Sequence, residues 1–150
     1  MTPKRKKFYI AMFLCYLLGL LWVLFARSQC EEPLPYWDHV MQHTNLIPFR
    51  TIALYWRLLV RPVRPVLTQL AIYNLLGNVL LFLPMGALLP TLFPGLRSFR
   101  KTLLMVAGSM VLAEICQVLL LTGSCDIDDI LLNLFGTALG YPLYRILTSK

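Results

Sequence analysis

Long, uninterrupted apolar runs constrain this chain more than any other feature. The first covers residues 8–26, and three more cover residues 71–93, 102–122 and 128–147. A helix of about 20 residues rises about 30 Å, which matches the hydrocarbon core of a bilayer. We therefore predict four transmembrane helices. A membrane β-barrel would need strands of about ten residues with alternating polarity, whereas these runs carry leucine on every face.

Composition indicates the same class of protein. The chain is 58% hydrophobic and only 14% charged, so it has too little polar surface to cover a water-soluble globule. We predict an all-α, polytopic membrane helix bundle in which residues 1–150 form a single integral membrane domain. The first run is too long for a signal peptide and lacks small residues before a cleavage site, so we expect it to be retained.

The basic residues predict the orientation. Four lie at positions 4–7 and three within 97–101, beside apolar runs. This pattern fits the positive-inside rule with both termini cytoplasmic and the protein in a cell membrane, and it explains the net charge of +7 without a nucleic-acid partner. Five arginines in the first outer connection weaken the bias. Residues 52–67 mix arginines with aromatic and aliphatic side chains, as an interfacial segment does.

Polar residues gather near one end of the last three predicted spans, whichever way the protein is inserted. Each helix contributes a pair spaced three or four residues apart, so each pair lies on one helical face. We predict that these faces converge into one functional cluster. Its members are Asn74, Asn78, Glu114, Gln117, Asp126, Asp128, Asp129 and Asn133.

The chemistry of this cluster stays open at the level of sequence. Amides often join membrane helices for packing alone, and Asp126 or Asp128 is well placed to cap the last helix. Three acids within four residues also repel one another. We therefore expect a compensating cation: an outer-loop arginine such as Arg50, a metal ion or a cationic ligand. The sequence identifies no particular catalytic residue, metal or cofactor.

Glycines predict where helices approach closely. Gly136 and Gly140 form a small-xxx-small pair on the face that carries Asn133, and Gly86 permits a close neighbour in the second span. A separate hypothesis concerns Cys30 and Cys125, which fall on the same outer side and are candidates for a disulfide.

Several motifs, taken in order, resemble the VanZ family of membrane proteins associated with teicoplanin resistance. They cover roughly residues 45–140. They are the outer-loop motif with Asn45, Pro48 and Phe49, followed by Arg50; NLLGN at 74–78 with FLPMG at 82–86; EICQ at 114–117; and DIDD at 126–129 with Asn133 and Gly136. One departure is that Gly123, Ser124 and Cys125 precede the acidic motif where some members carry an arginine.

The resemblance implies a cell-envelope membrane protein but supplies no reaction. Teicoplanin carries an acyl chain and targets lipid-linked cell-wall precursors. We favour a non-enzymatic protein whose outward polar pocket binds a lipid-linked precursor, a glycopeptide or a partner protein. The alternatives are a membrane enzyme acting on a lipid headgroup, with Glu114 or Asp129 as acid or base and Asp128 holding a divalent ion, and a small oligomeric transporter or channel. The oligomeric state is not determined by the sequence.

Overall fold

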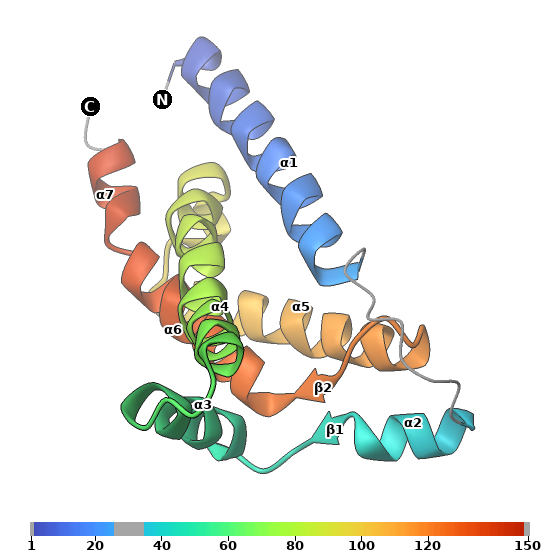
Figure 1. Ribbon diagram of the computed structural model, residues 1–150. Coiled ribbons are helices and arrows are strands. Elements are labelled where there is room, and N and C mark those ends of the chain that lie inside the picture. Colours follow the sequence, from blue (N-terminus) through green and yellow to red (C-terminus); the bar gives the residue numbers. More distant parts are fainter. Residues whose placement is uncertain (1, 26–34, 149–150) are drawn as a thin grey trace.

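The computed structural model describes residues 2–25 and 35–148, and nearly all of its regular structure is helical (Figure 1). Its elements, in chain order, are α1 (Pro3–Phe25), α2 (Tyr36–Gln42), β1 (Thr44–Asn45), α3 (Arg50–Val60), α4 (Pro65–Leu92), η1 (Pro94–Leu96), α5 (Phe99–Leu119), β2 (Cys125–Asp126), α6 (Ile127–Gly140) and α7 (Leu143–Thr148). The predicted all-α fold class is confirmed.

Four helices are long and apolar enough to cross a membrane, which makes the chain a multi-pass membrane protein. They are Pro3–Phe25, Pro65–Leu92, Phe99–Leu119 and Ile127–Thr148. The second begins at Pro65 rather than at residue 71, because proline is well tolerated in the first turn of a helix. The last is divided into α6 and α7 by a break at Pro142, which lacks the N–H that a continuous helix would use.

The close crossing of α4 and α6 lies at the centre of the bundle. A Cβ atom at Gly136 would overlap the carbonyl oxygen of Val79, and one at Gly140 would overlap that of Leu83. Gly86 is equally confined by the backbone of α6. The expectation that these glycines permit close helix packing is confirmed.

Helix α1 packs against the bundle through one stripe of side chains. Tyr9 and Leu20 are buried, and Phe13 and Tyr16 pack beside them against residues of α4. The hydroxyl of Tyr16 also donates to the carbonyl oxygen of Leu81 at 2.8 Å. The rest of α1 is largely exposed, as expected of a helix whose other faces contact lipid.

The two ends of the bundle differ. Figure 1 shows both chain termini at one end, which we call the terminal end, and α2, α3, β1 and β2 at the other, which we call the polar end. With four spans, both termini lie on the same side of the membrane. That this side is the cytoplasm stays a prediction based on the positive-inside rule.

A short parallel pairing organises the polar end. Strand β1 pairs with β2 so that Thr44 lies opposite Cys125 and Asn45 lies opposite Asp126. The backbone N–H of Cys125 also donates to the carbonyl oxygen of His43 at 2.8 Å. This pairing places the outer loop, far away in sequence, directly against the start of α6.

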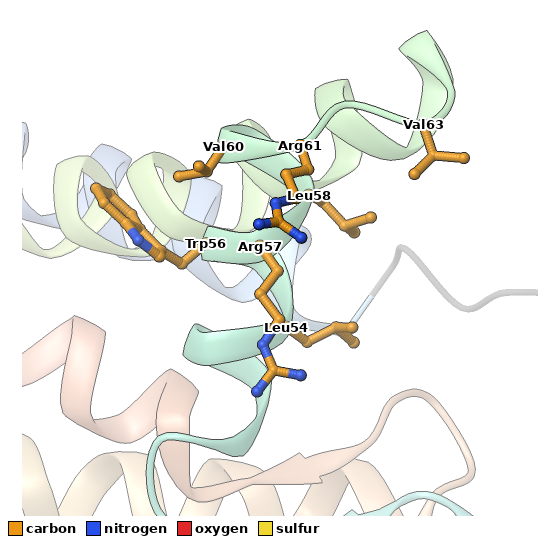
Figure 2. A pocket seen from close by; sticks show the side chains of 7 residues that line it. All are labelled: Leu54, Trp56, Arg57, Leu58, Val60, Arg61 and Val63. Atoms are coloured by element: carbon orange, nitrogen blue, oxygen red, sulfur yellow. The ribbon is translucent and has the colours of Figure 1, made fainter.

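The predicted interfacial segment, residues 52–67, proves to be two elements. Its first part lies in α3, which ends at Val60, and its last residues belong to α4. Trp56 is 63% exposed and Val60 is 61% exposed. Together with Arg57 and Arg61, both line a surface cleft of about 420 Å³, whose side chains are drawn in Figure 2. This mixture suits a membrane interface, and contact with the bilayer stays a prediction.

Candidate functional site

A polar cavity of about 170 Å³ lies at the polar end between α1, α4, α5 and α6. Six of the eight residues of the predicted cluster line it: Asn74, Asn78, Glu114, Gln117, Asp129 and Asn133. The rest of the lining is Val23, Leu24, Leu70, Thr122, Gly123 and Ser124. The structure thus brings the polar faces of three helices together, while their functional role stays a prediction.

Side-chain amides connect the walls of the cavity. Asn78 Nδ2 donates to Asp129 Oδ1 at 2.7 Å, which joins α4 to α6. Gln117 Nε2 donates to the carbonyl oxygen of Leu24 at 2.7 Å, which joins α5 to the end of α1. Asn74 instead donates to the carbonyl oxygen of Leu70 in its own helix, at 2.9 Å. The hydrogen bond of Gln117, and that of Asn78, therefore join neighbouring helices, as amides in membrane bundles often do.

The two acids of the cavity each bond through one carboxyl oxygen. Glu114 is 3% exposed, and its Oε2 accepts from the backbone N–H of Asp126 at 3.0 Å. Asp129 bonds through Oδ1 to Asn78. Within residues 2–25 and 35–148, no group donates to Oε1 of Glu114 or to Oδ2 of Asp129. Both acids therefore retain hydrogen-bonding capacity at the cavity.

Asn133 adds an unpartnered acceptor. Its side chain is 1% exposed, and in the described part of the chain nothing donates to its Oδ1. Burying a polar atom without a partner costs roughly 1–3 kcal/mol. Asn133 therefore places an unsatisfied, buried acceptor beside the cavity that this residue lines.

Asp128 belongs to a separate structure, which we call the α3–α6 junction. Its side chain is fully buried. Its Oδ1 accepts from the backbone N–H of Phe49 at 2.6 Å, and its Oδ2 accepts from those of Thr51 at 2.7 Å and Ile52 at 3.0 Å. These N–H groups belong to the N-terminal end of α3. Asp128 therefore caps α3 rather than its own helix, which corrects the expectation for this residue.

Asp126 completes the junction. Its Oδ1 accepts from Asn45 Nδ2 at 3.0 Å and from the backbone N–H of Asp128 at 2.9 Å, so it is the N-cap of α6 as predicted. Its Oδ2 accepts from the hydroxyl of Thr51 at 2.5 Å. The backbone N–H of Asp126 bonds to Glu114, which links the junction to the cavity.

The outer-loop motif supplies the geometry of the junction. Asn45 Oδ1 accepts from the backbone N–H of Ile47 at 3.3 Å, which tightens the turn through Pro48. Phe49 has a φ of 64°, a left-handed conformation that is uncommon outside glycine, and its N–H faces Asp128. Arg50, a candidate cation, begins α3 with an exposed side chain. The groups that bond to the junction aspartates are instead uncharged donors.

Thr51 is a junction residue that sequence reasoning does not identify. Its hydroxyl and its backbone N–H bond to different aspartates, and its Oγ1 also accepts from Asn45 Nδ2 at 3.0 Å. Nothing in the sequence singles out a threonine near the middle of a long connection. Only the pairing of β1 with β2 brings it to the acidic motif.

Two groups outside the spans respond to the negative charge of the polar end. Burial raises the pKa of Tyr55 above 10.0, and the charges of Asp129 and Asp126 raise it further. Burial also raises the pKa of the Cys125 thiol, with added contributions from Glu114 and Asp126. The negative charge of the nearby acids therefore reaches both Tyr55 and Cys125. Cys30, the proposed disulfide partner of Cys125, lies outside the described residues.

The junction leaves Asp128 without a spare oxygen for a metal ion. Both of its oxygens already accept from backbone N–H groups. Across residues 2–25 and 35–148, no group of three or more His, Cys, Asp and Glu side chains is arranged to hold a metal. We therefore assign Asp128 to the structure of the polar end.

The fold and the site together define a multi-pass helical membrane protein with a polar cavity at one end of its bundle. The model of the VanZ/LLP1 family matches residues 13–148, so the chain belongs to this family. The resemblance carried by the sequence motifs is thereby confirmed. No curated protein and no solved structure gave a significant match.

Proposed function

We propose that this VanZ/LLP1-family protein acts in the cell envelope, where its polar cavity binds the polar head of a lipid-linked cell-wall precursor and thereby contributes to teicoplanin resistance. The observation that carries the proposal is the unused acceptor capacity of the cavity. Asn133 Oδ1 has no donor among the described residues, and Glu114 and Asp129 each bond through one oxygen. Such a site favours a ligand rich in hydroxyl, amide N–H or ammonium groups.

The size of the cavity supports a headgroup over a whole antibiotic. At about 170 Å³, it is smaller than the roughly 300–1,000 Å³ of sites that enclose drug-sized ligands. One sugar ring or a short amine fits this space, and a glycopeptide would enter only in part. The lipid tail of a precursor would remain in the bilayer that surrounds the helices.

The position of the cavity also supports the proposal. Asn74 lies nine residues after Pro65, the first residue of α4, which corresponds to about 14 Å of helical rise. The cavity is therefore near the polar end, within reach of a headgroup at the membrane surface. With cytoplasmic termini, this end faces the exterior, where lipid-linked precursors meet teicoplanin.

Charge-neutralising variants test the proposal. Asp129→Asn and Glu114→Gln keep the volume of the side chain while removing its charge, and Asp38→Asn is a matched control because Asp38 is an exposed acid on α2. In a teicoplanin-sensitive host, we expect the two cavity variants to lose resistance at unchanged membrane abundance and the control to keep it. Wild-type resistance in both cavity variants would contradict a charge-dependent site.

A membrane enzyme is the second candidate, supported by the placement of two carboxyl groups on one cavity. Glu114 and Asp129 come from different helices, and either one has an oxygen available as a general base or acid. Purified protein, assayed for turnover of lipid headgroups with and without a chelator, tests this candidate. Turnover that Glu114→Gln abolishes would support it, and no turnover across a broad lipid panel would count against it.

A further inference from the structure

A second cavity, of about 220 Å³, lies at the terminal end, remote from the polar cavity. It is lined by Arg5 and Lys6 of α1, Thr91 and Leu92 of α4, Pro94 and Arg97 of the following connection, and Leu147 and Thr148 of α7. All the charged residues in this lining are cationic. We call it the basic cavity.

The connection after α4 is held in place at this end. The hydroxyl of Tyr141, at the break between α6 and α7, donates to the backbone carbonyl oxygen of Arg97. Thr91 is 3% exposed, so the floor of the basic cavity belongs to the packed end of α4. The cationic side chains therefore surround a formed depression at the end of three helices.

An apolar groove of about 510 Å³ adjoins the basic cavity. It is lined by Met12 and Tyr16 of α1, Leu83, Pro84, Ala87 and Leu88 of α4, and Leu143, Ile146 and Leu147 of α7. Leu147 lines both spaces, so they lie next to each other. From Lys6 to Met12, α1 rises about 9 Å, so the groove begins roughly one and a half helical turns along α1 from the basic cavity.

We infer that the basic cavity and the apolar groove together bind one anionic phospholipid from the surrounding leaflet. The phosphate lies between Lys6 and Arg97, and one acyl chain follows the groove between α1, α4 and α7. Lysine and arginine side chains are the usual partners of lipid phosphates at membrane surfaces. The positive-inside rule explains cations at this end, but it requires neither a cavity nor an apolar groove beside it.

The chemistry separates this occupant from a free phosphate ion. Inorganic phosphate or glycerol phosphate would use the basic cavity and gain nothing from the groove. A zwitterionic lipid would use the groove and gain less from the cations. An anionic lipid gains most from both, so its binding must depend on both halves of the site.

Native mass spectrometry of the detergent-purified protein, titrated with phosphatidylglycerol and with phosphatidylcholine of the same chain length, tests the basic half. We expect Lys6→Gln and Arg97→Gln each to weaken phosphatidylglycerol binding about fivefold, and the double variant about 25-fold, while phosphatidylcholine binding weakens less. Lys7→Gln and Arg100→Gln are matched controls, because both residues are exposed neighbours that do not line the cavity. Equal losses in the controls, or equal affinity for both lipids in the wild-type protein, would overturn the proposal.

A bulky side chain tests the apolar half. Ile146→Trp fills the groove and should weaken phosphatidylglycerol binding about fivefold or more, whereas Leu14→Trp, on a part of α1 outside the groove, should not. Glycerol phosphate at millimolar concentration should fail to displace the lipid. Displacement, or an unaffected Ile146→Trp variant, would reveal a simple phosphate site instead. A dimer that excludes lipid would show that a second copy occupies the groove.

Discussion

The α3–α6 junction and the polar cavity adjoin at one end of the molecule, and each is built around two acidic side chains. In the junction, both oxygens of Asp126 and of Asp128 accept hydrogen bonds from the outer loop or the start of α6. In the cavity, Glu114 and Asp129 each accept through one oxygen from a described residue. The two pairs of acids are thus distinguished by their surroundings. The junction aspartates have enough neighbouring donors for both oxygens, which indicates a structural role, whereas the cavity acids do not and are candidates for binding.

This difference arises from backbone placement. The start of α3 presents several N–H groups that have no partner within the helix, and the buried carboxylate of Asp128 satisfies three of them. The cavity faces side-chain amides and loop residues, which offer fewer donors. The junction aspartates thus use both of their oxygens as acceptors, whereas the two cavity acids each use one with the described residues.

The largest expected effect is that of Asp128→Ala. It removes the acceptor of three buried N–H groups, so we expect the free energy of unfolding to fall by about 3 kcal/mol. A lower melting temperature in detergent and faster proteolysis near α3 would measure this loss. Asp128→Asn keeps one carbonyl oxygen and should lose less. An Asp128→Ala protein that melts like the wild type would remove the distinction between junction and cavity.

Thr51→Val should have a smaller effect on the junction. It deletes the hydroxyl that donates to Asp126 and accepts from Asn45, but it leaves the backbone N–H bond to Asp128 intact. We expect a loss of about 1 kcal/mol, measured by the same thermal melt. Thr68→Val is the control, because the hydroxyl of Thr68 makes an exposed bond to the carbonyl oxygen of Arg64, the N-cap residue of α4, at 3.2 Å. If both variants lose the same free energy of unfolding, the hydroxyl of Thr51 does not stabilise the junction more than an exposed hydroxyl stabilises the end of a helix.

The cavity acids should tolerate neutralisation. Glu114→Gln and Asp129→Asn keep an acceptor oxygen for Asp126 N–H and for Asn78, so we expect each to change the free energy of unfolding by less than about 1 kcal/mol. Their melting temperatures should therefore stay near that of the wild type even where resistance is lost. If either melts as low as Asp128→Ala, the cavity acids are structural as well.

The smallest effect concerns Cys125, which reports the charge of the cavity. Its pKa is raised by burial first and then by the charges of Glu114 and Asp126, so at a given pH less of it is the reactive thiolate. Glu114→Gln should lower this pKa and speed alkylation by iodoacetamide at pH 8 by roughly twofold. The effect is small because solvent partly screens the charge of Glu114 at Cys125. The measurement needs a background in which the other three cysteines are replaced. An unchanged rate would show that Glu114 exerts no charge on Cys125.

Much of the fold follows from local sequence. A bilayer offers no water to the backbone, so a spanning segment must be a continuous apolar helix, and such runs are visible without a structure. Helical spacing also fixes which polar residues share a face, which is why the three pairs around the cavity could be grouped in advance. The glycines of the α4–α6 crossing are local signals of the same kind, because a missing side chain permits close approach whatever the partner.

The sequence by itself therefore determined the membrane class, the four spans and the end of the bundle at which polar residues gather. Only the tertiary structure decided which acids are saturated. Thr51 and Asp126 meet because β1 pairs with β2 across a long stretch of chain, and no periodicity encodes that contact. Helical periodicity reports the neighbours of a residue along one helix. The donors that reach a buried carboxylate come from other elements, and their identity depends on how the whole chain packs.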